Sequence, residues 1–283
     1  MKPAKFKYVA PTTLDDALRH LASDPDAKVL SGGQSLMPLL AMRLAAPSIL
    51  VDLQHVPDLA GIEDADGEVR IGARVTHRAV HESSIVAGRV PILRAAARQI
   101  AHPQIRSRGT FGGSTAHADP SGEFPTVLLA LDATMHVSGP QGSRAVGADD
   151  YFTGPFTTSM RDTEILTHVS VPTARTAWSF QEAAVKAGDY GLALVAVTGV
   201  VRDGALTTPR VSVGGAVSAV MRLAGVEQVL EGAALSSRLS ERAAEVAAET
   251  VTPISDIHGS SDYRRKLVGS LVRRAVAELR NGA

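Results

Sequence analysis

Two glycine-rich segments carry the residues of this chain that are best suited to binding chemistry. Residues 31–40 read SGGQSLMPLL, and residues 109–120 read GTFGGSTAHADP. In each, a pair of adjacent glycines is followed by small polar residues, which lets the backbone come very near a ligand and adds short hydroxyl groups. Loops of this kind bind phosphate through successive N–H groups. Their repetition predicts a ligand with two phosphates or a long polar body, such as a dinucleotide.

Other kinds of chemistry have weaker support. One isolated Gly-Gly pair is typical of an ordinary turn, and only the repetition favours a binding role. The chain lacks the P-loop motif, the Rossmann fingerprint between a strand and a helix, and the G-x-S-x-G elbow of hydrolases. His77 and His81 have the i, i+4 spacing of metal ligands, but no third ligand follows, so we expect a packing or surface role and no metal site. Redox chemistry would therefore come from a bound cofactor.

Composition excludes several further classes. The 29 basic and 29 acidic residues balance, which does not favour a nucleic-acid or anionic-membrane partner. The absence of cysteine excludes disulfides, thiol nucleophiles, a cysteinyl flavin linkage and an iron–sulfur cluster in this chain. No signal-peptide pattern follows Met1, and no apolar run is long enough to cross a bilayer, so a cytoplasmic protein is expected.

The first segment, residues 1–55, is predicted to be an N-terminal subdomain that holds the first glycine-rich loop. Thr12 and Thr13 precede an apolar rhythm typical of a capped amphipathic helix. We expect strands at residues 28–30 and 48–53, with a brief helix at residues 38–44. The loop then lies at a strand-to-helix turn, where unpaired N–H groups favour an anion.

A second segment, residues 56–174, is predicted to be a middle subdomain with a mostly antiparallel sheet. The expected strands are 68–73, 134–138 and 165–171, and the expected helices are 76–82, 91–100 and 123–131. Residues 139–163 read as loop-rich. Their aromatic residues Tyr151, Phe152 and Phe156 would be buried in the loop, or would form a lid or partner surface.

The last segment, residues 175–283, is predicted to be an α+β domain. Stretches 178–184, 192–201 and 210–216 are rich in β-formers, and Asp203-Gly204 is a hairpin signal. Helices are expected at 240–250 and 263–280. The second carries Leu267, Leu271, Ala275 and Leu279 on one stripe, which would pack against the sheet or, alternatively, dock a partner.

The glycine-rich segments resemble a known pair of motifs. Gly32-Gly33-Gln34-Ser35-Leu36, and Thr110-Phe111-Gly112-Gly113-Ser114 followed by His117-Ala118-Asp119-Pro120, are similar to the FAD-binding medium subunit of molybdenum hydroxylases. That group includes flavoprotein subunits of carbon monoxide dehydrogenase and of the xanthine dehydrogenase family. The resemblance runs nearly end to end. It implies an α+β fold with a PCMH-type, vanillyl-alcohol-oxidase-like pair of FAD-binding subdomains and a C-terminal domain of small antiparallel sheet and helices.

The resemblance also implies which residues contact non-covalent FAD. Gly32 to Leu36 would wrap the pyrophosphate from one side, and Thr110 with Gly112 to Ser114 from the other. His117 would lie near the ribityl chain or the diphosphate. Either Asp119 or Glu123 would accept hydrogen bonds from the hydroxyl groups of ribityl or ribose, with Glu123 favoured. The remaining implied contacts are Ser31, Ala101 and Lys186, together with Ile165 and Leu166, which would pack against the adenine or flavin edge.

Tyr190 follows Lys186 in a loop that, by resemblance, approaches the isoalloxazine. It is either a gate over one flavin face or an aromatic that fills the core at a strand end. No residue of this chain is expected to be catalytic in the sense of acting on the oxidised substrate.

The implied function is electron relay. A large subunit would oxidise substrate at a molybdenum cofactor, a small subunit would carry [2Fe–2S] clusters, and FAD in this chain would pass their electrons to an external acceptor. The complex would be a dimer of heterotrimers. The substrate class stays open among carbon monoxide, aldehydes, purines and other N-heterocycles. Two alternatives are a stand-alone flavin oxidase with its own substrate pocket, and an assembly module that has lost its flavin.

Overall fold

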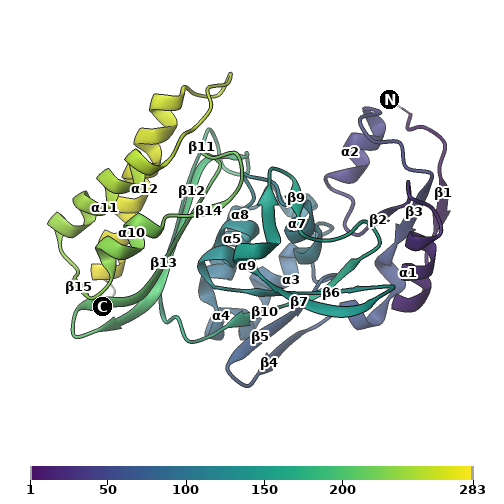
Figure 1. Cartoon of the computed structure of the whole chain (residues 1–283), viewed down its shortest axis with the longest axis horizontal. Coiled ribbons are helices and arrows are strands. Elements are labelled where there is room, and N and C mark those ends of the chain that lie inside the picture. The colour runs from purple at the N-terminus through teal and green to yellow at the C-terminus, as the bar shows by residue number, and fades with distance from the viewer. Residues whose placement is uncertain (1, 282–283) are drawn as a thin grey trace.

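A computed structural model of the chain describes residues 2–281. Three main sheets lie in a row, with the N-terminal and C-terminal parts at opposite ends and the middle part between them (Figure 1). Helices and sheets are mixed in each part, as the α+β prediction requires. The predicted boundaries after residues 55 and 174 stay predictions, and residues 1 and 282–283 of the outer predicted domains lie outside the described residues.

The N-terminal part is a parallel three-stranded sheet in the order β1-β3-β2. Its elements are β1 (Lys7–Val9), α1 (Leu14–Ala22), β2 (Lys28–Leu30), α2 (Leu36–Ala41), β3 (Ile49–Asp52), η1 (Leu53–His55) and η2 (Pro57–Leu59). The Thr13 hydroxyl accepts from the Asp16 N–H and caps α1, which confirms the predicted cap. Helix α2 begins two residues before the predicted start at residue 38. Proline is tolerated there because N–H groups in a first helical turn have no intrahelical partner to lose.

The middle part is an antiparallel five-stranded sheet in the order β4-β5-β10-β6-β7. Its elements are β4 (Ile62–Ala65), β5 (Glu68–Gly72), α3 (His77–Glu82), α4 (Ser84–Arg89), α5 (Pro91–Gln99), α6 (Pro103–Arg106), α7 (Phe111–His117), α8 (Glu123–Ala130), β6 (Thr134–Gly139), β7 (Gly142–Gly147), α9 (Ala148–Tyr151), β8 (Phe152–Gly154), β9 (Thr157–Thr158) and β10 (Ile165–Pro172). Helices α5, α7 and α8 form its core with the buried face of the sheet. Phe111 and Phe124 meet edge to face there, 4.8 Å between ring centres.

The loop-rich prediction for residues 139–163 is wrong in its first half. Strand β7 pairs along its length with β6, and the turn between them uses Gly142 at φ 101°. Strand β7 lies at the sheet edge and is mostly polar, so its residues do not alternate between apolar and polar. The sequence therefore lacked the alternation that normally predicts a strand. Tyr151 and Phe152 are buried as the first alternative expects, whereas Phe156 is 57% exposed.

The C-terminal part is an antiparallel sheet covered by helices. Its elements are β11 (Ala177–Ala184), β12 (Gly191–Arg202), β13 (Ala205–Gly214), β14 (Met221–Arg222), α10 (Ala224–Leu230), β15 (Ala233–Ala234), α11 (Ser237–Thr250) and α12 (Ser261–Asn281). The Asp203-Gly204 hairpin is confirmed, and β13 begins directly after it rather than at residue 210. Helix α10 was not predicted. Helix α12 packs against β11 and β12 (Figure 1). Of its predicted stripe, Leu271, Ala275 and Leu279 are buried in the core there, and Leu267 is partly buried.

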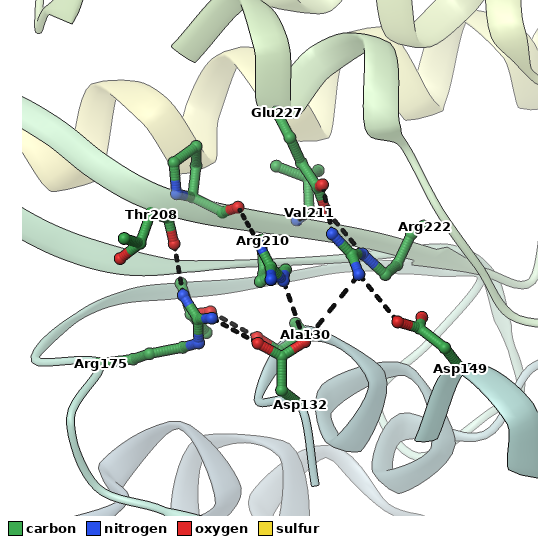
Figure 2. Close-up of polar contacts among 11 residues, drawn as sticks. Ala130, Asp132, Asp149, Arg175, Thr208, Arg210, Val211, Arg222 and Glu227 are labelled. Atoms are coloured by element: carbon green, nitrogen blue, oxygen red, sulfur yellow. Dashed lines mark hydrogen bonds and ion pairs between the residues drawn. The ribbon is translucent and has the colours of Figure 1, made fainter. Parts of the chain in front are cut away.

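An ion network joins the middle and C-terminal parts (Figure 2). Asp132, just after α8, accepts from Arg175 on the connection into β11 and from Arg210 Nε on β13 at 2.9 Å. Arg222 on β14 lies 4.0 Å from Asp132 and donates to Asp149 of α9 at 2.8 Å. These charges tie the two parts together beside the helix that carries Glu123. None of the described helices is both long and apolar enough to span a membrane.

Candidate functional site

A cleft of about 530 Å³ lies between the two glycine-rich loops, which is within the range of cofactor sites. It brings together residues from the N-terminal part, the middle part and the loop between β11 and β12. The predicted site residues that line it are Ser31, Gly32, Gly33, Gln34, Ser35, Leu36, Ala101, Thr110, Gly113, Ser114, His117, Asp119, Glu123 and Tyr190.

The first loop supplies a row of unpaired amides. Within residues 2–281, the backbone N–H groups from Gly32 to Leu36 have no hydrogen-bond acceptor. Gly33 adopts φ +72°, a conformation that L side chains rarely take. Successive free N–H groups along a turn form a concave binding surface for an anion. The backbone of this loop therefore has the free N–H groups that phosphate binding needs, and the binding itself stays a prediction.

Gly32 lets the two glycine-rich segments meet. A Cβ atom at this position would lie 2.3 Å from the Arg108 carbonyl oxygen and 2.7 Å from Gly109 Cα. No side chain fits there without moving backbone. The first loop therefore rests directly on the chain that enters the second loop, and both loops line one cleft.

The second glycine-rich segment is not a loop as predicted: Phe111–His117 form helix α7, and the amides of its first turn are already bonded. We keep the name second loop for residues 109–120. The Gly112 N–H donates to the Ala73 carbonyl at 2.9 Å, and the Gly113 N–H donates to Thr110 Oγ1 at 3.1 Å. A Cβ on Gly112 would lie 2.4 Å from that of Ala73, so this glycine allows α7 to pack on the chain after β5. Gly112 does not line the cleft. The second loop thus presents hydroxyl groups, chiefly that of Ser114, rather than a row of amides.

His77 lies in the cleft wall, although the sequence indicated only a packing or surface role. Its Nε2 atom lies 2.9 Å from both the Thr110 carbonyl and the Ser114 hydroxyl. Because a carbonyl only accepts, Nε2 carries the hydrogen. Nδ1 is buried and has no partner among the described residues. Burial lowers the pKa of His77 to about 4, so the ring is neutral at pH 7.

No local pattern could have assigned His77 to the cleft. Its neighbours there are far away in the sequence: a Cβ on Gly109 would lie 2.7 Å from the His77 ring. The spacing to His81, which suggested a metal pair, has no role in this arrangement. The ring instead orients Ser114.

The acidic end of the cleft contains Asp119 and Glu123. The Asp119 carboxylate accepts from the Ser121 N–H at 2.8 Å, which closes a local turn. Burial raises the pKa of the Glu123 carboxyl to about 8, and the negative charges of Glu182 and Asp119 add to the effect. Tyr190 is 73% exposed at the edge of the cleft, so the core-filling alternative for this residue is wrong.

Three further predicted contacts lie away from the cleft wall. Ile165 and Leu166 are buried in hydrophobic cores. Lys186 points into solvent and lies 3.9 Å from Asp189 in an ion pair. Residues that line the cleft without having been predicted as contacts include Phe156, which lies 5.1 Å from the His117 ring, and the apolar side chains of Leu39, Ile100 and Ile105.

Free amides, hydroxyl groups, apolar side chains and two carboxyl groups line one cleft, a combination typical of proteins that bind a phosphate-bearing cofactor. Family models agree: residues 4–174 match the FAD binding domain in molybdopterin dehydrogenase, and residues 178–279 match the CO dehydrogenase flavoprotein C-terminal domain. The chain belongs to the family of FAD-binding medium subunits of molybdenum hydroxylases, and its cofactor is FAD.

Relatives and solved structures match over nearly the whole chain. The nicotine 6-hydroxylase medium subunit of Paenarthrobacter nicotinovorans is 46% identical over 98% of both chains. Quinoline 2-oxidoreductase from Pseudomonas putida 86 superposes with a TM-score of 0.96 at 38% identity, covering 100% of this chain and 99% of that one. Carbon monoxide dehydrogenase from Hydrogenophaga pseudoflava gives a TM-score of 0.95 at 34% identity over 98% of both.

Proposed function

We propose that this chain relays electrons within a molybdenum hydroxylase complex, from [2Fe–2S] clusters of a partner subunit to an external acceptor. Bound FAD supplies the chemistry, because it takes up electrons singly and releases them in pairs. The observation that carries the proposal is the row of unpaired amides from Gly32 to Leu36 in a cleft that Thr110 and Ser114 of the second loop also line.

The residues of the cleft fit FAD in a specific way. The Gly32 to Leu36 amides would bind the diphosphate, and each hydrogen bond to a charged oxygen contributes roughly 1.5 to 3 kcal/mol. Ser114, held by His77, would bind the diphosphate from the opposite wall. Glu123 would bind hydroxyl groups of the ribityl chain or the ribose. Ser31, Ala101, His117 and Asp119 complete the proposed contact set, and Tyr190 would gate one flavin face.

The expected partners follow from the way this family distributes its cofactors over separate subunits. We infer a large molybdenum-cofactor subunit and a small [2Fe–2S] subunit, arranged as a dimer of heterotrimers. Relatives of this chain are named as medium subunits or chains of enzymes for nicotine, carbon monoxide and glyceraldehyde. Since similar medium subunits serve such different substrates, we infer that the large subunit selects the substrate. The cytoplasmic location stays a prediction.

Co-purification from the native source tests this function. The expected result is a flavin spectrum in this chain, with iron and molybdenum in separate partner chains. A second measurement adds the candidate organic substrate to the isolated chain. Direct bleaching of its flavin by that substrate would contradict the relay and favour the stand-alone oxidase. A colourless chain within an intact complex would contradict the cofactor role.

A further inference from the structure

Phe156 occupies a turn position where glycine is normally found. Strands β8 and β9 form a hairpin in which Gly154 pairs with Thr157, so Pro155 and Phe156 alone make the connection. Phe156 adopts φ +53° there. In a turn whose first central residue is proline, a positive φ at the second favours glycine or asparagine, because most L side chains are strained in this conformation. A phenylalanine at this position therefore costs conformational energy.

A second strained residue holds this turn against α7. The Phe156 N–H donates to the Ala118 carbonyl at 3.1 Å, and Ala118 itself adopts φ +49° at the C-cap of α7. The Phe156 ring centre lies 5.1 Å from that of His117, the last residue of α7, with 47° between the two planes. Both residues line the FAD cleft. The tip of the hairpin thus brings an aromatic ring to the cofactor site.

Packing in a core does not explain this arrangement. Phe156 is 57% exposed, whereas Tyr151 and Phe152 of the same segment are buried. Among the exposed large hydrophobic residues of the described chain, only Phe156 and Tyr190 line the cleft. Strained backbone conformations cluster at sites that bind a ligand, where the ligand contact offsets their cost. The strain at Phe156 therefore points to a ligand that covers its ring.

We propose that Phe156 is a contact residue for bound FAD, and that its ring and the His117 ring pack against a ring of the cofactor. Aromatic rings attract one another in offset or edge-to-face arrangements. A cofactor that covers the Phe156 ring also removes apolar surface from water. FAD contains two aromatic ring systems, adenine and isoalloxazine, and the experiment below distinguishes them. The inference deepens the proposed function and rests on the FAD cleft.

The test separates FAD affinity from stability in Phe156→Gly. This change removes the ring and relieves the strained φ. Titrations of the full-length apo chain, followed by quenching of flavin fluorescence, should show FAD binding weakened about tenfold. The urea midpoint of the apo variant should be no lower than that of wild type, because the lost ring is mostly exposed and glycine accepts a positive φ. Phe156→Tyr keeps the ring and should bind FAD like wild type.

Thr208→Gly is the matched control. Thr208 of β13 adopts φ +49°, is exposed and does not line the cleft. The change relieves the same kind of strain, so FAD affinity should stay at the wild-type value. The absorbance spectrum of bound FAD then assigns the ring. A shifted flavin band in Phe156→Gly places Phe156 on the isoalloxazine, and an unshifted band with weaker affinity places it on adenine.

Three results would contradict the contact. Wild-type FAD affinity in folded Phe156→Gly would overturn it and leave the proposed function intact; if that variant also lost the partner chains on co-purification, the ring would belong to a partner surface instead. A urea midpoint well below wild type, with FAD affinity still weak in Phe156→Tyr, would show a purely structural role. A wild-type chain that binds no FAD would overturn the cofactor site itself, and the inference with it.

Discussion

The Ser31 and Thr110 hydroxyl oxygens lie 2.9 Å apart, although these residues belong to different parts of the fold. Thr110 is also the N-cap of α7, where its Oγ1 accepts from the Gly113 N–H. The Thr110 hydroxyl thus caps the N-terminus of α7 and also contacts the first glycine-rich loop. The position of the second wall of the cleft relative to the first depends on this contact.

Thr110→Ala should therefore weaken FAD binding and lower the free energy of unfolding by about 1 kcal/mol, the usual loss on removing an N-cap. Thr13→Ala is the matched control, because Thr13 caps α1 in the same way outside the cleft. Urea denaturation should give similar losses for both variants, while an FAD titration should weaken only for Thr110→Ala. Equal FAD affinity in the two variants would contradict the proposed link.

Gly33→Val should abolish FAD binding, because the side chain strains a backbone at φ +72° and disturbs the row of free amides. Gly67→Val is the control: Gly67 has φ +78°, and nothing lies within 4 Å of a Cβ there. Both variants should lose about 1 to 2 kcal/mol of stability, but only the first should purify without flavin absorbance. A yellow Gly33→Val protein would show that the first loop does not bind the diphosphate.

Asp132→Asn should loosen the junction between the middle and C-terminal parts. Asparagine tolerates the φ of +51° found here, so the change removes charge with little backbone strain. We expect a loss of about 2 kcal/mol in urea denaturation, because charge-assisted hydrogen bonds to Arg175 and Arg210 are weakened.

Asp162→Asn provides the comparison for that loss. The Asp162 side chain is 88% exposed, and its ion pair with Lys28 spans 3.7 Å, so the change should cost less than about 1 kcal/mol. Similar losses in both variants would argue against a special role for the network around Asp132.

The buried neutral ring of His77 should make stability fall in acid. The pKa of His77 is about 4 in the folded chain and about 6.5 when unfolded, so the unfolded state binds more protons between these values. Stability should decrease as pH falls through this window, by up to about 3 kcal/mol from this group alone. His77→Gln keeps an N–H near the Thr110 carbonyl but does not titrate.

The measurement is urea denaturation of wild type and His77→Gln at a series of pH values. His168, whose pKa is also lowered to about 4, titrates in the same window, so only the difference between the two curves isolates His77. Parallel curves would contradict a neutral His77 in the folded chain.

Tyr190→Ala should leave FAD bound and speed its reoxidation by small acceptors. The exposed ring at the cleft edge would limit access, and its loss should change the rate by up to roughly tenfold, equivalent to about 1.4 kcal/mol of barrier. Stopped-flow absorbance measures this rate. Tyr263→Ala, an exposed tyrosine on α12, should react like wild type. An unchanged rate in Tyr190→Ala would remove the gate.

The sequence predicted well those elements that depend on residues close together in the chain. The Thr13 cap and the Asp203-Gly204 hairpin are both present, because capping and tight turns depend on residues only a few positions apart. Strand β7 and helix α10 were missed. Strand β7 is polar and lies at a sheet edge, so its pairing with β6, rather than its own composition, makes it a strand.

The sequence by itself determined the family, because the resemblance runs nearly end to end. It also supplied the conformational freedom that the backbone uses at Gly33, which is a property of glycine itself. Only the tertiary structure decided that Gly112 packs on Ala73 and that His77 holds Ser114. These roles depend on contacts between residues far apart in the sequence, and no local spacing encodes such contacts.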